Sequence, residues 1–209
     1  MEWSLAPIWN KEDVYIIGGG PSVKSFPIRC LKNKKVIGCN DAFLFGSEIV
    51  DIEFFGDSKW FDFHKIQLRK FLNPIITNSE KLANEDLEWV YSMPRKTSGF
   101  HKDAIGWNGN TGAAAINLAL ILGVQRIFLI GFDMKLSDDG SSNWHSNFLN
   151  SPTEIHYERY RNVVAEYLSD LLDYWPNVQF INLNPDSALE CFPKKDPKTF
   201  FEGEENGSQ

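Results

Sequence analysis

Short apolar runs bounded by turn residues recur along the chain and define its predicted framework. The clearest runs have the length and continuity of buried strands in a parallel sheet. They cover residues 14–17, 36–39, 52–55, 127–130 and 178–182, and weaker candidates cover 74–77 and 87–91. Most of them close on glycine, asparagine or aspartate, so these predicted strands lead directly into turns.

Two segments between these runs carry helical patterns. Residues 111–122 are apolar on nearly all sides, which predicts a buried helix that Thr111 can cap and Gly123 can end. Residues 153–175 place apolar side chains at three- and four-residue spacing, which predicts an amphipathic helix that Pro176 stops. The alternation of strands and helices predicts an α/β fold: a single Rossmann-like domain with a mostly parallel sheet and helices on both faces.

The composition fits one folded domain. Of the 209 residues, 43% are apolar and 14% aromatic, which is enough to bury a sizeable core. There is no internal repeat. We assign residues 1–200 to this domain and expect residues 201–209, which are acidic and polar, to form a disordered tail.

Charge, hydropathy and cysteine content indicate which partners and which compartment to expect. The formal net charge of −7 argues against a broad nucleic-acid interface, although a small basic patch stays compatible with it. No apolar run reaches the roughly 18 residues of a membrane span, and Met1–Ser4 lacks the features of a signal peptide. Three widely spaced cysteines suit a reducing compartment. We therefore expect a cytoplasmic protein without a membrane partner.

A glycine-rich turn follows the first predicted strand, in the order Gly18, Gly19, Gly20, Pro21, Ser22. Glycines let the backbone approach a phosphate or a base closely, and Pro21 suits the first turn of a helix that Gly20 would cap. The dinucleotide fingerprint would need glycine at Val23, and the Walker pattern is absent. The turn therefore suits a nucleotide of neither common type; the alternative is a tight strand-to-helix turn without a ligand.

Other predicted strand or helix ends carry small polar side chains. These are Asn40-Asp41, Asp57-Ser58, Asn110-Thr111-Gly112 and Asp133. Each alone has an ordinary explanation as a cap or a turn. Together they would gather at the carboxyl edge of a parallel sheet, where open α/β sheets bind ligands.

These motifs resemble, in order, those of glycosyltransferase family 42, the bacterial sialyltransferases that use CMP-sialic acid. The resemblance covers about residues 13–192 and is carried by Gly18–Ser22, Cys39-Asn40, Asn110–Gly112, Gly131–Met134 and Asn184–Ser187. The chain is also similar to phage-borne and bacterial relatives of that family, and to archaeal 6-hydroxymethylpterin diphosphokinases.

The resemblance implies a donor site. The glycine-rich turn would bind the nucleotide phosphate and ribose, Asn40 and Asp57 would face the donor, and residues 131–134 would hold a cytosine-type base. The candidate donor-binding residues are Gly18, Gly19, Gly20, Pro21, Ser22, Asn40, Asp57, Ser58, Asn110, Thr111, Gly112, Gly131, Phe132, Asp133 and Met134.

The chain departs from the family pattern in three places. Gly19 and Asp57 each replace an asparagine, which removes one side-chain contact and adds one negative charge. The segment after Asp133 is shorter than the family's lid and lacks its tyrosines. These departures put sialic acid itself in question as the transferred sugar.

A transferase of this kind needs a general base, and histidine suits that role. The first candidate is His145, in a polar loop at the position where the phage-borne relatives carry a Trp-His pair. The second is His156, whose distance from Asn184-Pro185 is closer to that in the sialyltransferases. We favour His145. His64 is expected to pack in a helix, and Asp138-Asp139 to form an acidic turn rather than a metal site.

Three hypotheses follow. The first is a metal-independent glycosyltransferase that uses a nucleotide-activated sugar, with CMP-linked donors as one option, and needs no cofactor. The second is a diphosphokinase-like transferase that uses ATP with Mg²⁺, for which Asp57 and Asp133 are the carboxylates available. The third is a nucleotide-binding module without activity. The acceptor and the oligomeric state cannot be inferred from the sequence.

Overall fold

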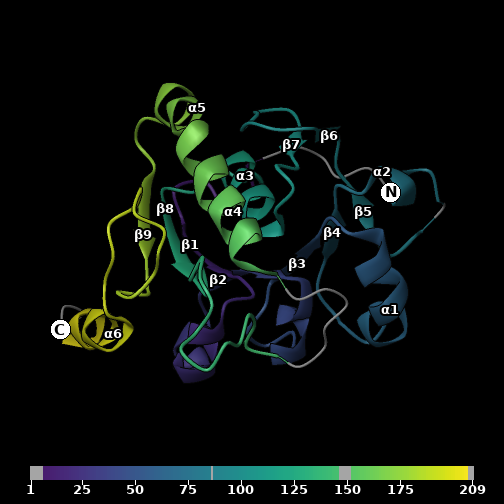
Figure 1. Cartoon of the computed structure of the whole chain (residues 1–209). Helices are drawn as coiled ribbons and strands as arrows, with labels where there is room; N and C mark the ends of the chain where they lie inside the picture. Colours follow the sequence, from purple (N-terminus) through teal and green to yellow (C-terminus); the bar gives the residue numbers. More distant parts are fainter. Residues whose placement is uncertain (1–6, 86, 146–151, 207–209) are drawn as a thin grey trace.

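The structure is a computed structural model that describes residues 7–85, 87–145 and 152–206. Seven strands form one parallel sheet in the order β5-β4-β3-β2-β1-β8-β9 (Figure 1). Their bounds are β1 Asp13–Ile17, β2 Lys35–Cys39, β3 Ile52–Phe55, β4 Ile75–Thr77, β5 Tyr91–Ser92, β8 Arg126–Ile130 and β9 Gln179–Asn182. Two short strands, β6 Arg95–Lys96 and β7 Ile105–Gly106, pair separately.

Helices cover both faces of the sheet. The α-helices are α1 Ser58–Leu68, α2 Glu80–Ala83, α3 Thr111–Ile121, α4 Glu154–Glu166, α5 Leu168–Tyr174 and α6 Pro197–Asn206. The 3₁₀ helices are η1 Pro21–Ser25, η2 Ile28–Leu31 and η3 Asn40–Phe45. α3, α4 and α5 lie over one face (Figure 1), where α3 packs on alternate residues of β1 such as Val14 and Ile16. Tyr15 and Ile17 point to the other face, toward η1, η2 and α6.

The predicted α/β fold is confirmed, with differences in detail. β5 begins at the last residue of the weak candidate at 87–91 and ends one residue beyond it. The long amphipathic segment divides into α4 and α5 at Tyr167, which has left the helical conformation. The segment after the glycine-rich turn is a short 3₁₀ helix rather than an α-helix, so it offers less helix dipole to an anion than expected.

Within the segment expected to form a disordered tail, residues 201–206 belong to α6. Phe201 is buried, with its ring centroid 6.0 Å from that of Tyr15 and 6.0 Å from that of Phe26. Phe200 packs on Phe128 of β8. The acidic composition of this segment therefore obscured an aromatic pair that packs on the same face of the sheet as η1 and η2.

None of the helices in the described ranges has the length and apolar character that crossing a bilayer requires.

Candidate functional site

A cleft of about 550 Å³ opens at the carboxyl edge of the sheet. It lies beside the ends of β1 and β8, where the order of the strands changes direction, which is the usual ligand position in open α/β sheets. Most of the residues predicted from the sequence meet there. Those that line the cleft are Gly18, Gly19, Gly20, Asn40, Asp57, Asn110, Thr111, Gly112, Gly131, Phe132, Met134, His145 and His156.

Four predicted residues do not line the cleft: Pro21, Ser22, Ser58 and Asp133. Asp133 is buried beneath the glycine-rich turn and holds it in place. Its carboxylate accepts hydrogen bonds from the backbone N–H of Ser22 at 3.1 Å, from the Ser22 hydroxyl at 2.9 Å and from the Asn184 amide at 3.1 Å. Burial raises the pKa of Asp133, and the bonds from Ser22 oppose that shift. Ser22 and Asp133 therefore join the segments that follow β1 and β8.

Packing inside the fold explains most glycines of the site. A Cβ at Gly18 would lie 3.2 Å from the Phe132 ring, and one at Gly112 would lie 2.9 Å from the same ring. A Cβ at Gly20 would lie 2.6 Å from the Gly131 carbonyl oxygen, besides meeting the Asp133 carboxylate. At Gly19 a Cβ would approach only the Asn143 amide oxygen, at 3.1 Å. Gly19 is therefore the position in the turn with the most room.

The glycine-rich turn also offers fewer free N–H groups for binding an anion than expected. The N–H groups of Gly18 and Gly20 donate to the carbonyls of Ile130 and Gly131, and that of Ser22 donates to Asp133. The start of α3 is better suited to an anion. Asn110 caps this helix by accepting from the N–H of Ala113 at 2.9 Å. The first-turn residues Thr111 and Gly112 line the cleft, at the positive end of the helix dipole.

Asn40 and Asp57 form the wall of the cleft beyond β2 and β3. Asn40 has a left-handed backbone with φ of 56°, and its side-chain oxygen is buried without a hydrogen-bond partner among the described residues. Asp57 caps α1 by accepting from the N–H of Lys59 at 2.8 Å. The Asn40 amide is thus left to interact with a ligand in the cleft.

His145 lines the cleft beside a buried carboxylate. Its Nδ1 lies 3.3 Å from Oδ2 of Asp41, a residue that is 1% exposed, while the His145 side chain is 12% exposed. Desolvation lowers the pKa of His145; the Asp41 charge raises it and His64 lowers it. The ring is thus a neutral acceptor over a wider pH range than an ordinary histidine, with Asp41 able to stabilise the protonated form.

His156 lies at the start of α4 and also lines the cleft. Its Nδ1 accepts from the backbone N–H of Thr153 at 3.1 Å, and the Thr153 side chain caps the helix in return. His156 is exposed. The structure therefore gives this candidate base a capping role, and within the described ranges it forms no ion pair with a carboxylate like that of His145.

Sequence reasoning missed part of the polar cluster behind His145. Asp41 was noticed only as a neighbour of Asn40, and His64 only as a packed helix residue. Trp60 and His64 are four residues apart and share one face of α1, so both reach Asp41. The four-residue spacing of Trp60 and His64 is the sequence signal that could have indicated this polar cluster. Aromatic residues of the cleft wall that were not selected are Trp60, Trp107, Tyr157 and Tyr160.

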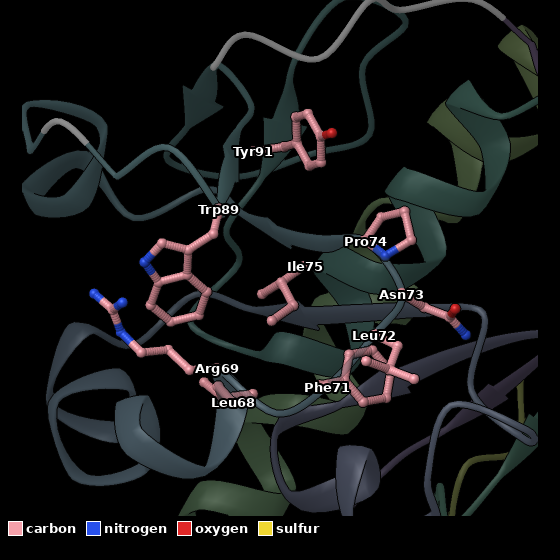
Figure 2. A pocket seen from close by; sticks show the side chains of 9 residues that line it. All are labelled: Leu68, Arg69, Phe71, Leu72, Asn73, Pro74, Ile75, Trp89 and Tyr91. Carbon is pink, nitrogen blue, oxygen red and sulfur yellow. The ribbon is translucent and has the colours of Figure 1, made fainter.

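A second cavity, of about 410 Å³, lies elsewhere on the sheet (Figure 2). It is formed where α1 ends and β4 begins, and it shares no lining residue with the cleft. Figure 2 shows Arg69 beside Trp89, with the guanidinium 5.0 Å from the centre of the indole ring. The polar strand ends described above are absent from its lining.

No group of three or more metal-ligating side chains gathers within the described part of the chain. Asp138-Asp139 lies in a turn, as predicted. Asp139 accepts from the Ser137 hydroxyl at 2.5 Å and from the Ser141 N–H at 2.9 Å, which accounts for its place in that turn.

The same α/β fold is found in solved glycosyltransferases. No protein-family model matches the chain, and no curated protein matches it. The MAf glycosyltransferase of Magnetospirillum magneticum AMB-1 superposes with a TM-score of 0.65 and 15% identity over 95% of this chain. The chain spans only 37% of that protein's length.

Two sialyltransferase structures are also similar, one of CstII from Campylobacter jejuni and one of CST-II. The complex with cytidine-5′-monophosphate gives a TM-score of 0.57 and 18% identity, covering 90% of this chain and 86% of that one. The complex with a trisaccharide acceptor and CMP gives 0.54 and 17%, covering 87% and 85%. At these identities the likeness is one of fold.

Proposed function

We propose that this chain is a metal-independent glycosyltransferase that uses a nucleotide-activated sugar. The observation that carries the proposal is the pairing of His145 with the buried Asp41 at the wall of the cleft. The cleft lies where open α/β folds bind nucleotides, and the fold is shared with glycosyltransferases.

The proposed reaction is a displacement at the anomeric carbon of the donor. An acceptor hydroxyl oxygen forms the new bond to that carbon while the bond to the leaving phosphate oxygen breaks. His145 takes the proton of the hydroxyl, and Nε2 is the nitrogen for that step because Nδ1 faces Asp41. Asp41 stabilises the imidazolium that forms.

The leaving phosphate would lie at the start of α3. There the N–H groups of Thr111 and Gly112 and the Thr111 hydroxyl can stabilise the developing negative charge. Asn40 offers its buried side-chain oxygen to the donor from the opposite wall. This arrangement uses the helix terminus more than the glycine-rich turn, whose N–H groups are largely bonded within the fold.

Calorimetric titration with CMP, CDP, UDP and ATP tests the nucleotide part of the proposal. CMP comes first because CstII was solved with it. We expect a cytidine or uridine nucleotide to bind without added Mg²⁺. Failure of every cytidine and uridine nucleotide to bind would remove the proposal.

His145→Ala tests the catalytic part. The variant is expected to keep nucleotide binding and to lose about 10²–10⁴-fold in donor turnover, the usual contribution of a general base. Turnover is measured as nucleotide released from a panel of sugar donors, with water or added saccharides as acceptor. Nucleotide binding without turnover of any donor, and without an effect of His145→Ala, would instead support a binding module without activity.

Diphosphoryl transfer from ATP with Mg²⁺ is the second candidate, and the geometry favours it less. Of the two carboxylates it would use, Asp57 lines the cleft while Asp133 is bonded to Ser22 and Asn184 outside it. ATP binding that strictly requires Mg²⁺ would favour this candidate over the first.

A further inference from the structure

The Asp41 carboxylate is shared by two histidines. On one oxygen it accepts a hydrogen bond from the Trp60 indole N–H at 2.7 Å and meets Nε2 of His64 at 3.4 Å. On the other oxygen it meets Nδ1 of His145 at 3.3 Å. Asp41 and His64 are each 1% exposed, so solvent screens these contacts little.

His64 is held in this position from several sides. Its ring packs against Phe43 and Trp60, with centroids 5.5 Å and 4.8 Å away, and against Phe63. Its Nδ1 lies 3.1 Å from the side-chain oxygen of Gln67, one turn along α1. Each ring nitrogen of His64 therefore faces an acceptor, and the ring cannot turn away from Asp41 without losing both contacts.

We propose that His64 is a positioning residue for His145, acting through the Asp41 carboxylate that the two rings share. A proton on His64 neutralises much of the charge with which Asp41 attracts a proton to His145. The proton affinity of His145 then depends on the charge that His64 places beside the shared carboxylate. The assignment of His145 as a base rests on the proposed function, whereas the coupling of the rings does not.

Burial disfavours the charged forms of two other titratable groups near the cluster. Glu53 of β3 is fully buried, and burial together with the Asp41 charge raises its pKa well above the ordinary value. The Cys39 thiol of β2 is buried as well, and burial and Glu53 raise its pKa. Asp41 and His64 act in opposite directions on the pKa of His145, which the Asp41 charge raises and His64 lowers.

Titration of the imidazole rings tests the coupling. Long-range ¹H–¹⁵N correlation spectra of the full chain follow each histidine against pH, without any donor. His64→Phe keeps an aromatic ring in the pocket and removes both nitrogens. We expect it to raise the titration midpoint of His145 by about one pH unit, and we expect Asp41→Asn to lower it. His101→Gln is the control, since that ring bonds the Ser98 carbonyl away from the cleft, and His145 should titrate unchanged.

An unchanged His145 midpoint in folded His64→Phe would overturn the proposal. If His64→Phe does not fold, His64→Gln replaces it. The wild-type chain gives an independent test: His145 should show an inflection at the pH where the His64 signals move, and a single-site curve for His145 contradicts the coupling. Because no donor is present, failure of this proposal and failure of the proposed function are distinguishable.

Discussion

At the scale of single residues, the proton affinity of His145 depends on a carboxylate that solvent hardly reaches. Asp41 is 1% exposed and is paired with a more accessible ring, so it can act on the proton affinity of His145 without contacting a substrate. A surface pair of the same kind would be screened and would contribute little. The burial of Asp41 is what makes His145 a better candidate for the base than His156.

The pH dependence of turnover follows from the pKa of His145. As a base the ring must be neutral, and desolvation lowers its pKa below the ordinary histidine value of about 6.5. We therefore expect kcat/KM for donor turnover to be flat at neutral pH and to fall about tenfold per pH unit only in a more acidic range. A pH profile measured with saturating acceptor checks this. An acid limb centred above the ordinary histidine value would contradict the assignment.

His156→Ala is expected to affect stability more than chemistry. The substitution removes the side chain that accepts from the Thr153 N–H, and losing one cap interaction costs about 1 kcal/mol. Urea unfolding followed by circular dichroism measures the loss, and donor turnover of the folded variant should stay within a few-fold of wild type. A turnover loss as large as that of His145→Ala would move the base to His156.

At the residue scale, prediction from the sequence located the side chains that meet at the cleft where those side chains follow strand ends. Asn40, Asp57 and Thr111 come directly after predicted strands or at a helix start, and the parallel topology brings them together. It failed where a role depends on a contact between distant segments. The engagement of Asp133 by Ser22, 111 positions away, and that of Asp41 by His145 belong to tertiary packing.

At the scale of elements, the glycine-rich turn is built to pack as much as to bind. Its glycines admit Phe132 and Asp133, which follow β8, and so fix the ends of two neighbouring strands against each other. Such close approach requires the lack of a Cβ, whatever ligand the cleft takes. The turn therefore fixes one wall of the cleft, and the start of α3 supplies the helix N-terminus that faces it.

Paired alanine substitutions in the turn test this division. Gly20→Ala places a Cβ against the Gly131 carbonyl and the Asp133 carboxylate, and overpacking of this kind costs about 1–3 kcal/mol. Gly19→Ala meets only the Asn143 side chain, so the free energy of unfolding should change by less than about 1 kcal/mol. Urea unfolding of both variants measures the difference. Equal destabilisation would show that the turn does not pack as described.

The elements themselves were predictable to different degrees. The five clear apolar runs became β1, β2, β3, β8 and β9, because buried parallel strands leave a continuous apolar signal. The short β5 and the separation of α4 from α5 at Tyr167 leave no comparable signal. α6 was missed because its polar residues outnumber the aromatic pair that holds it to the sheet.

At the scale of the whole molecule, the two cavities lie at different edges of one sheet. The cleft takes its lining from the carboxyl ends of β1, β2, β3 and β8, whereas the cavity of Figure 2 begins where β4 starts. Parallel topology makes these edges chemically different, because loops after the strands bring helix starts and polar turns to only one of them. A nucleotide should therefore distinguish between them.

Hydrogen exchange with and without nucleotide tests which cavity is used. The first N–H groups of α3 have no partner within the helix, so Thr111 and Gly112 should exchange rapidly in the free chain and several-fold more slowly with nucleotide bound. Gly18 and Gly20 already donate to backbone carbonyls and should change less. Residues 68–75 and 89–91 serve as the internal control. Protection of these segments instead of the α3 start would place the nucleotide in the other cavity, and with it any chemistry would lie far from His145.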